Sequence, residues 1–220
     1  GFGDDWLRIG PVKIFADGAE VKGMPDMAKQ PWIRGFTTNP TLMRKAGITD
    51  YETFAKEVLQ VVKGFPISFE VFADDVAEME RQARKISAWG DNVYVKIPVT
   101  NTRKEPTYEL ARRLSKDGVK LNVTALMTLE QVAAVSEAVA EGPASYISVF
   151  AGRIADTGRD PVPLMQAALA LMQRAPRSEL IWASPRELLN IFQADAIGCH
   201  VITVTNDILN KLKLVGKALD

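Results

Sequence analysis

The chain of 220 residues carries 27 Lys and Arg against 27 Asp and Glu, so its formal net charge is zero with the single histidine neutral. This balance argues against nucleic acid or an anionic membrane as a partner. Hydrophobic residues make up 47 % and charged residues 25 %, as in globular proteins, and no apolar run reaches the roughly 18 residues of a membrane span. One cysteine excludes an internal disulfide and fits a reducing compartment, for which we expect the cytoplasm.

Short runs rich in β-branched and aromatic residues alternate with longer amphipathic stretches along the chain. In chain order, the runs predict strands at Val12–Asp17, Ile33–Asn39, Ile67–Val71, Val93–Pro98, Leu121–Leu126, Tyr146–Ala151, Leu180–Ala183 and Val201–Thr205. The stretches carry apolar residues three and four apart and predict helices at Tyr51–Lys63, Asp75–Trp89, Thr107–Lys116, Leu129–Glu141, Pro163–Arg174 and Pro185–Ala194.

This alternation predicts an α/β fold with a parallel sheet. Eight strands in 220 residues fit a (βα)8 barrel, and the absence of a linker rich in Gly, Ser or Pro predicts a single domain over residues 1–220. The alternative is an open doubly wound sheet. Such a sheet usually carries a Gly-rich phosphate turn after its first strand, and Asp17-Gly18-Ala19-Glu20 does not have that pattern.

Polar side chains interrupt the apolar strands, mostly near the carboxyl ends, where barrels place catalytic groups. These residues are Asp17, Thr37, Thr38, Asn39, Ser68, Glu70, Lys96, Asn122, Thr124, Ser148, Arg153, Ser184, Arg186, Thr203 and Thr205. Because side chains alternate along a strand, Lys96 faces away from Val95 and Ile97. If the apolar faces meet the helices, the polar set points into one mouth of the barrel.

Several of these residues also have a structural explanation. Lys96 and Glu70 could form a structural ion pair, and Asp17 could cap the helix that follows it. Asn122 and Thr124 could be hydrogen-bonding residues within the layers of side chains that fill a barrel. We interpret four further residues near the last strand as structural, namely Cys199, His200, Thr203 and Thr205.

A single lysine among carboxylates, hydroxyls and an amide suits imine chemistry that needs neither a metal ion nor a cofactor. Burial favours the neutral amine, which attacks a ketone, and the resulting iminium accepts electrons when a C–C bond breaks. The reaction needs two carboxylates in different roles, which Asp17 and Glu70 can supply. Arg153 and Arg186 suit a phosphate, and Arg186 follows the seventh strand, where barrels often build phosphate sites.

Six segments in this order resemble the transaldolase family, which includes the small fructose-6-phosphate aldolases. They are Phe15-Ala-Asp17-Gly-Ala19, Gly35-Phe-Thr-Thr-Asn-Pro40, Val95-Lys-Ile-Pro98, Asn122-Val-Thr124, Ser148-Val-Phe-Ala-Gly-Arg153 and Ala183-Ser-Pro-Arg186. Together they extend over nearly the whole chain. The resemblance implies a (βα)8 barrel that acts on sugar phosphates and forms a homo-oligomer.

The resemblance also implies a role for each matching residue. Lys96 would form the Schiff base, and Asp17 would be the base for C–C cleavage. Glu70 and Thr124 would handle the catalytic water. The remaining residues would bind substrate: Asn39 and Asn122 at the dihydroxyacetone hydroxyls, Arg153, Ser184 and Arg186 at the phosphate, and Thr38, Ser148 and Phe150 within the same site.

Two positions distinguish the branches of the family. Glu70 and Phe150 resemble the transaldolase branch, whereas the aldolase branch typically has Gln and Tyr there. A tyrosine hydroxyl could help water to release the enamine, and a phenylalanine leaves the enamine waiting for an aldehyde. We therefore predict transfer of a dihydroxyacetone unit from a ketose phosphate to an aldose. The alternatives are aldol cleavage of fructose 6-phosphate, a specialised biosynthetic transaldolase with another acceptor, and a non-catalytic sugar-phosphate-binding barrel.

Several segments depart from the family's usual pattern. Val149 replaces a proline, and Pro185 stands where an aromatic residue is usual. The loop Val99–Pro106 is longer and more basic than usual, and Lys22–Pro25 is also unusual. We expect both loops on the active-site face. Three of their basic residues are therefore either solvated charges or contacts for an anionic acceptor, namely Lys22, Arg103 and Lys104.

Overall fold

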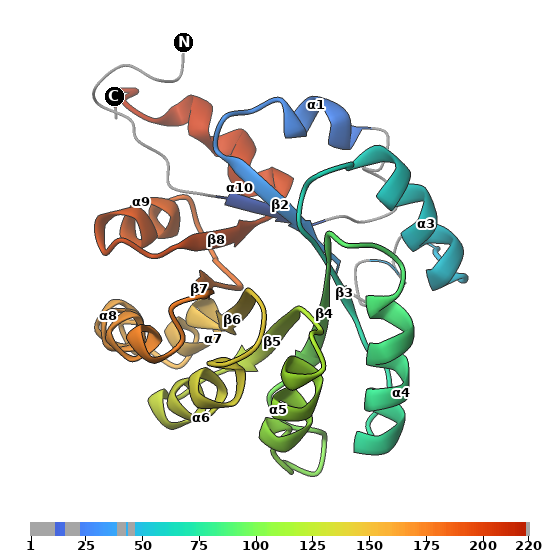
Figure 1. Cartoon of the computed structure of the whole chain (residues 1–220). Coiled ribbons are helices and arrows are strands. Elements are labelled where there is room, and N and C mark those ends of the chain that lie inside the picture. The colour runs from blue at the N-terminus through green and yellow to red at the C-terminus, as the bar shows by residue number, and fades with distance from the viewer. Residues whose placement is uncertain (1–11, 16–22, 39–42, 44–46, 219–220) are drawn as a thin grey trace.

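A computed structural model describes residues 12–15, 23–38, 43 and 47–218 of the chain. Within these residues, eight parallel strands form a closed barrel in which each strand pairs with the next and β8 pairs with β1. The helices lie outside the ring of strands (Figure 1). The predicted (βα)8 barrel is therefore confirmed. An open sheet is excluded because its first and last strands in space would each lack a neighbour.

The strands are β1 (Val12–Phe15), β2 (Ile33–Thr37), β3 (Ile67–Glu70), β4 (Val93–Pro98), β5 (Leu121–Leu126), β6 (Ser145–Val149), β7 (Ser178–Trp182) and β8 (Val201–Val204). The α-helices are α1 (Met24–Ala28), α3 (Tyr51–Val61), α4 (Val76–Ser87), α5 (Tyr108–Lys116), α6 (Leu129–Val139), α7 (Ala151–Ala155), α8 (Val162–Leu171), α9 (Leu189–Ala196) and α10 (Asn206–Asn210). Two 3-10 turns, η2 (Met172–Arg174) and η3 (Lys211–Leu214), continue α8 and α10.

Side chains cap three of the helices that follow strands. Asp50 accepts a hydrogen bond from the Thr53 N–H at the start of α3, and Asp75 accepts two at the start of α4. Thr128 and Gln131 form a reciprocal capping box at the start of α6. These bonds satisfy N–H groups that a first turn leaves without partners. They therefore fix where each helix begins relative to the strand before it.

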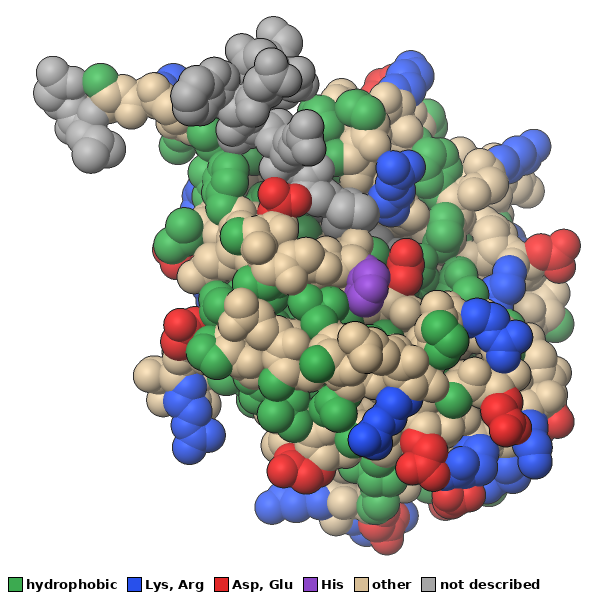
Figure 2. Space-filling view, turned by 60° about the vertical axis from the view of Figure 1, so that its left-hand side comes forward, with side chains coloured by type: hydrophobic (Ala, Val, Ile, Leu, Met, Phe, Trp, Pro, Cys, Tyr) green, Lys and Arg blue, Asp and Glu red, His purple; other side chains and the backbone are tan. Residues whose placement is uncertain are grey.

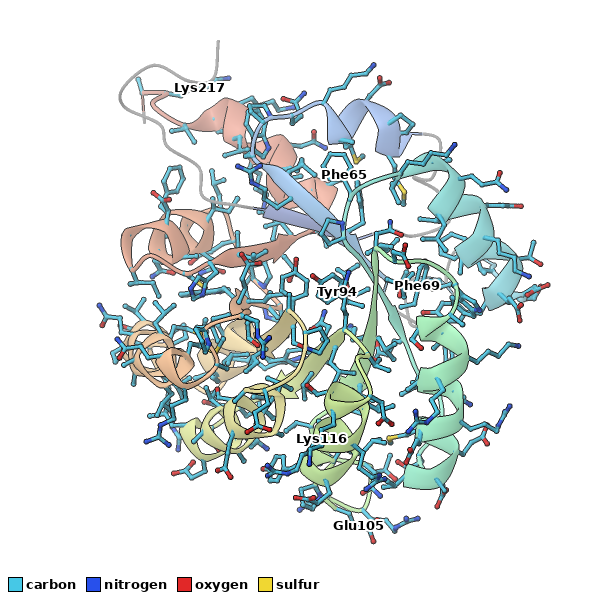
Figure 3. All side chains as sticks on the ribbon, viewed as in Figure 1. Phe65, Phe69, Tyr94, Glu105, Lys116 and Lys217 are labelled. Carbon is cyan, nitrogen blue, oxygen red and sulfur yellow. The ribbon has the colours of Figure 1, made fainter. Side chains whose placement is uncertain are left out.

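The alternation of side chains along the strands separates two apolar regions. Outward-facing residues such as Phe36 and Phe69 pack against the helices in the main core, and Figure 3 shows Phe69 on the helix side of β3. The inward-facing residues form a second cluster, toward whose centre Tyr94 points in Figure 3. The cluster consists of Tyr94, Tyr146, Ile181, Ala183 and Val201. This apolar cluster lies in the interior of the barrel, next to the inward-facing polar residues of the strands.

Several predicted boundaries are shifted by a few residues, and two of the shifts are on the carboxyl side of the barrel. Ala151, predicted as the end of a strand, begins the short helix α7. The helix predicted from Pro185 begins only at Leu189. The Asn190 side chain accepts hydrogen bonds from the N–H groups of Arg186 and Glu187 at 2.7 and 3.2 Å, and these bonds hold the preceding residues in a loop.

The surface mixes charges of both signs, as the zero net charge predicts. Figure 2 shows blue and red side chains interspersed over one face. Helices α4 and α5 are joined by two exposed ion pairs, Arg84–Asp117 and Arg113–Glu80, each at 2.7 Å. Among the described residues, no helix combines the length and the apolar character that a membrane span requires.

Candidate active site

The most deeply buried charged contact of the site joins neighbouring strands. Glu70 at the end of β3 is in register with Lys96 on β4. The Lys96 Nζ atom lies 2.9 Å from Glu70 Oε2, and Lys96 is only 8 % exposed. Nζ also lies 3.4 Å from the main-chain oxygen of Thr38, to which it donates. The strand register thus brings the predicted nucleophile and one predicted acid/base together. This contact fits both explanations given above, an acid/base pair and a structural ion pair.

A cavity of about 110 Å³ opens beside this pair at the carboxyl ends of the strands. Its lining is Thr37, Lys96, Asn122, Thr124, Ser148, Phe150, Arg153, Ala183, Ser184 and Thr203. The volume equals that of about three to four waters in the liquid, at about 30 Å³ each. Seven of the predicted site residues belong to this lining, and they come from four different strands or the loops after them.

Five other predicted residues have different placements. Glu70 contacts Lys96 directly. Thr38 meets Lys96 through its main-chain oxygen, and its hydroxyl bonds elsewhere. Arg186 is not part of the cavity lining. Asp17 and Asn39 lie outside the described residues.

One wall of the cavity is a chain of buried side-chain hydrogen bonds. The Ser148 hydroxyl on β6 donates to Asn122 Oδ1 on β5 at 2.7 Å. The Asn122 amide in turn donates to the Ser68 hydroxyl on β3 at 3.0 Å. Both bonds fix the orientation of the amide, and one of its two hydrogens remains available. Asn122 is therefore a preoriented donor in the cavity wall.

Two other hydroxyls in the lining have no such partner. Thr124 Oγ1 on β5 and Thr203 Oγ1 on β8 are buried and make no hydrogen bond among the described residues. A buried hydroxyl without a partner costs about 1–3 kcal/mol, and a polar molecule in the cavity can supply the partner. Thr203, interpreted above as structural, is therefore also a candidate site residue. Its signal in the sequence was the alternation with Ile202 and Val204, the same signal that marked Lys96.

The arginines predicted to hold a phosphate differ in position. Arg153, at the start of α7, is exposed and lines the cavity. Arg186 instead makes a two-pronged ion pair with Asp156, with its Nε donating to Oδ1 at 3.0 Å. This guanidinium, with a smaller contribution from Arg153, holds the pKa of the Asp156 carboxyl below its usual range. Both partners are about half exposed, so water weakens the attraction between them.

The loops after β6 and β7 touch at Gly152. A Cβ atom at this position would lie 1.6 Å from the Ser184 main-chain oxygen, a distance at which atoms overlap. Ser184 itself has φ of 59°, in the left-handed region that a residue with a side chain seldom adopts. The Ser184 backbone is therefore held in a strained conformation directly beside the cavity that it lines.

In the basic loop after β4, Arg103 is paired with two carboxylates, one from this loop and one from the loop after β3. Arg103 lies 2.9 Å from Glu105 and 4.0 Å from Asp74. The N–H and the hydroxyl of Thr102 both donate to Asp74 at 2.7 Å, which ties this loop to the loop after β3. Figure 3 shows Glu105 at the periphery, away from the barrel centre marked by Tyr94. These contacts favour the solvated explanation for Arg103; Lys22 lies outside the described residues.

A larger cavity, of about 420 Å³, lies between α1, β2 and the α10–η3 segment. Its described lining includes Met27, Trp32, Leu209 and Leu212, and Lys213 is its one charged residue. It shares no residue with the cavity beside Lys96. A site without an acid/base pair cannot provide the proton transfers of imine chemistry, so the smaller cavity is the candidate active site.

Relatives of this chain are named as transaldolases. A probable transaldolase of Dehalococcoides mccartyi is 34 % identical over 202 residues, which cover 91 % of this chain and 90 % of the relative. A probable transaldolase of Methanococcus maripaludis is 33 % identical over 202 residues, covering 91 % and 89 %. Such similarity over most of both chains extends beyond any single motif.

Solved structures share the barrel at low sequence identity. A 3-hexulose-6-phosphate synthase from Salmonella typhimurium superposes with a TM-score of 0.60 at 14 % identity, covering 91 % of this chain and 90 % of that one. A mandelate oxidase gives 0.61 at 14 % identity, covering 93 % and 67 %. These likenesses concern the fold alone. Residues 14–219, by contrast, match the sequence pattern described as Transaldolase/Fructose-6-phosphate aldolase, and the chain belongs to this family.

Proposed function

We propose that the protein transfers a dihydroxyacetone unit from a ketose phosphate to an aldose acceptor through a Schiff base on Lys96. The observation that carries this proposal is the Lys96 amine, nearly buried and 2.9 Å from Glu70, in the wall of a polar cavity at the carboxyl ends of the strands. Membership of the family supports the same assignment.

Imine formation uses the contact between Lys96 and Glu70. Glu70 takes a proton from the Lys96 ammonium, and the neutral Nζ then attacks the ketone carbon of the donor. A C–N bond forms, and Glu70 gives its proton to the ketone oxygen, which becomes a hydroxyl. Glu70 then accepts a second proton from the nitrogen and returns it to this hydroxyl, which leaves as water. Thr124 Oγ1 has no partner among the described residues, so it is available to hold the departing water. The product is an iminium on Lys96.

Cleavage of the C–C bond follows from the iminium. A base removes the proton of the C4 hydroxyl, a new carbonyl forms there, and the bonding electrons move to the iminium to give an enamine. Asp17, which the family resemblance implies for this base, lies outside the described residues. Asn122, fixed by Ser148 and Ser68, is oriented to donate its remaining amide hydrogen to a hydroxyl of the three-carbon unit. Attack of the enamine on the acceptor aldehyde reverses these steps.

Phe150 favours transfer over release. Its side chain lines the cavity and carries no hydroxyl that could protonate the enamine. The enamine therefore persists until an aldehyde arrives. Arg153 and Ser184 line the same cavity and provide a guanidinium and a hydroxyl for the substrate phosphate. Arg186 can join them when the phosphate competes with Asp156 for its guanidinium.

Borohydride trapping tests the proposal. The protein is incubated with fructose 6-phosphate, reduced, digested and analysed by mass spectrometry. We expect a reduced dihydroxyacetone adduct on Lys96 that is lost in Lys96→Ala and retained in Lys116→Ala, whose lysine is exposed on α5. Labelling of another lysine, with Lys96→Ala still active, would overturn the proposal.

The branch of the family is decided by the acceptor. We expect the products formed from fructose 6-phosphate to depend on an added aldose phosphate, with little free dihydroxyacetone in its absence. Phe150→Tyr should increase that release because it returns a hydroxyl to the cavity. Abundant dihydroxyacetone from the unmodified protein without an acceptor would instead assign it the aldolase reaction.

A further inference from the structure

Tyr51 is the first residue of α3, and it is held against the barrel by three aromatic rings. It meets Phe69, Phe72 and Trp89 edge-on, with ring centroids at 6.0, 4.7 and 5.9 Å. Phe69 is completely buried in the main core. Edge-to-face packing of this kind fixes the direction of a ring. The Tyr51 hydroxyl is thus delivered to one fixed place, between the ends of β2 and β3.

The hydroxyl of Tyr51 completes a directional chain of hydrogen bonds. The Glu70 N–H donates to Tyr51 Oη at 2.7 Å, and Tyr51 Oη lies 3.0 Å from Thr38 Oγ1. Thr38 Oγ1 donates onward to the Ser68 main-chain oxygen at 3.0 Å. Since the Thr38 hydrogen goes to Ser68, Tyr51 must donate to Thr38. Burial also raises the pKa of the Tyr51 phenol, which keeps its proton in place.

This chain of hydrogen bonds begins just beyond the last paired residues of β2 and β3. The described pairing of β2 with β3 ends at Thr37 and Ser68, whereas β3 continues to Glu70. The Glu70 N–H therefore lies beyond that pairing, and the Tyr51 hydroxyl accepts its hydrogen bond instead. An unpaired amide at this place would be destabilising and would loosen the end of β3.

Two residues of the chain, Glu70 and Thr38, contact Lys96. The Glu70 carboxylate lies 2.9 Å from Nζ, and the Thr38 main-chain oxygen lies 3.4 Å from it. We propose that Tyr51 is a positioning residue, whose hydroxyl locks Glu70 to Thr38 and so holds both oxygens on the Lys96 amine. Because its own hydrogen is committed to Thr38, Tyr51 acts through Glu70 and not as an acid toward substrate. This inference rests on the proposed function.

Tyr51→Phe tests the role because it keeps the ring and removes only the hydroxyl. We expect kcat for transfer and the rate of borohydride trapping on Lys96 to fall about tenfold, the scale of a small misplacement of reacting groups. The KM for the ketose phosphate should change by less than about twofold, since Tyr51 does not line the cavity. Tyr108→Phe is the matched control: Tyr108 is the first residue of α5, and its hydroxyl makes no hydrogen bond among the described residues.

Thr38→Val breaks the same chain from the other side. We expect a similar loss of kcat, and we expect the double variant with Tyr51→Phe to lose little more than either single variant, because both changes remove one link. Circular dichroism and thermal unfolding establish that each variant is folded. Multiplying losses in the double variant would show that the two hydroxyls act separately and would overturn the inference.

The outcomes separate this inference from the proposed function. If the unmodified protein traps on Lys96 and Tyr51→Phe matches Tyr108→Phe in kcat and trapping rate, the positioning role is wrong and the proposed function stands. A raised KM with unchanged kcat would also overturn it, since this would place Tyr51 in substrate binding. If the unmodified protein does not trap on Lys96 at all, both proposals fall.

Discussion

The two ends of the barrel interior use polar side chains in opposite ways. At the carboxyl end, the inward-facing Thr124 and Thr203 line a cavity and have no partner among the described residues. At the amino end, the rings of Tyr94 and Tyr146 pack with centroids 4.5 Å apart, and burial raises the pKa of both phenols. His200 Nδ1 accepts a hydrogen bond from the Leu180 N–H at 3.0 Å, in line with its predicted structural role.

This difference shows what marks a site inside a barrel. Polar residues occur at both ends, but the amino end engages them in contacts within the protein, whereas the carboxyl end leaves hydroxyls for a ligand. In the part of the chain that the structure describes, the other buried side-chain polar atoms without a partner lie on a helix or at outward-facing strand positions, namely those of Ser115, Ser178 and Trp182. Unsatisfied polarity on the inward face of the barrel is therefore more informative than polarity alone.

The largest contrast is expected between two lysines at opposite ends. Lys96→Ala should lower transfer by about 10⁴-fold or more and abolish trapping, because it removes the nucleophile. Lys120→Ala, which removes an amine bonded to the Asp91 main-chain oxygen near the Tyr94 ring, should leave kcat within about twofold. Steady-state kinetics measures both. Equal losses in the two variants would erase the functional difference between the ends.

Two carboxylates sharpen the comparison next. Glu70→Gln should slow trapping on Lys96 by about 10²-fold or more, the usual scale for a lost acid/base group. Glu179→Gln changes an exposed carboxylate that lines the cavities at the amino end, and it should trap at the rate of the unmodified protein. Rapid quenching with borohydride measures the rates. A Glu70→Gln variant that traps normally would leave the contact with Lys96 as a structural ion pair.

Cys199, just before β8 at the amino end, is a buried free cysteine that the proposed reaction does not use. Burial raises the pKa of its thiol to about 11, from an ordinary value of 9.0. At pH 8 the folded protein should therefore react with a thiol reagent about 10²-fold more slowly than the unfolded chain. The rate should increase with pH up to about 11 in the folded protein. A midpoint near 9 would mean that the thiol is open to solvent.

The smallest effect is expected at Thr203. Thr203→Val removes a hydroxyl that has no partner in the described residues, so the free energy of unfolding should stay the same or rise. If substrate supplies the partner, the KM for the ketose phosphate should rise about five- to tenfold. Ser178→Ala, which removes a comparable hydroxyl outside the active-site cavity, should leave KM unchanged. An unchanged KM in Thr203→Val would return this residue to the structural interpretation.

The sequence predicts the barrel and most of the cavity lining because both depend on local patterns. Alternation along a strand is a property of neighbouring residues, and it places Lys96, Asn122 and Ser148 on the inner face without knowledge of the rest of the chain. The same alternation does not by itself identify Thr203 as a site residue, because threonine is common in strands for its shape alone. Only its position in the cavity wall, with no hydrogen-bond partner, distinguishes it.

Contacts that arise between distant segments could not be predicted. Tyr51 begins a helix, and nothing in its neighbourhood of the sequence indicates that its hydroxyl reaches the Glu70 amide. The ion pair of Arg186 with Asp156 joins residues thirty positions apart. Each depends on tertiary geometry, which local propensity does not contain.

The contact at Gly152 has a consequence for redesign of the substrate range. Because the Ser184 oxygen occupies the space of a Cβ atom, even Gly152→Ala must push the loop after β7 away from the loop after β6. A movement of one loop therefore displaces the other, because the two backbones are in contact at Gly152 and Ser184. A mutant library aimed at new donors must vary residues 150–156 and 183–187 jointly. A change in one loop alone would leave it packed against a partner loop whose shape no longer fits.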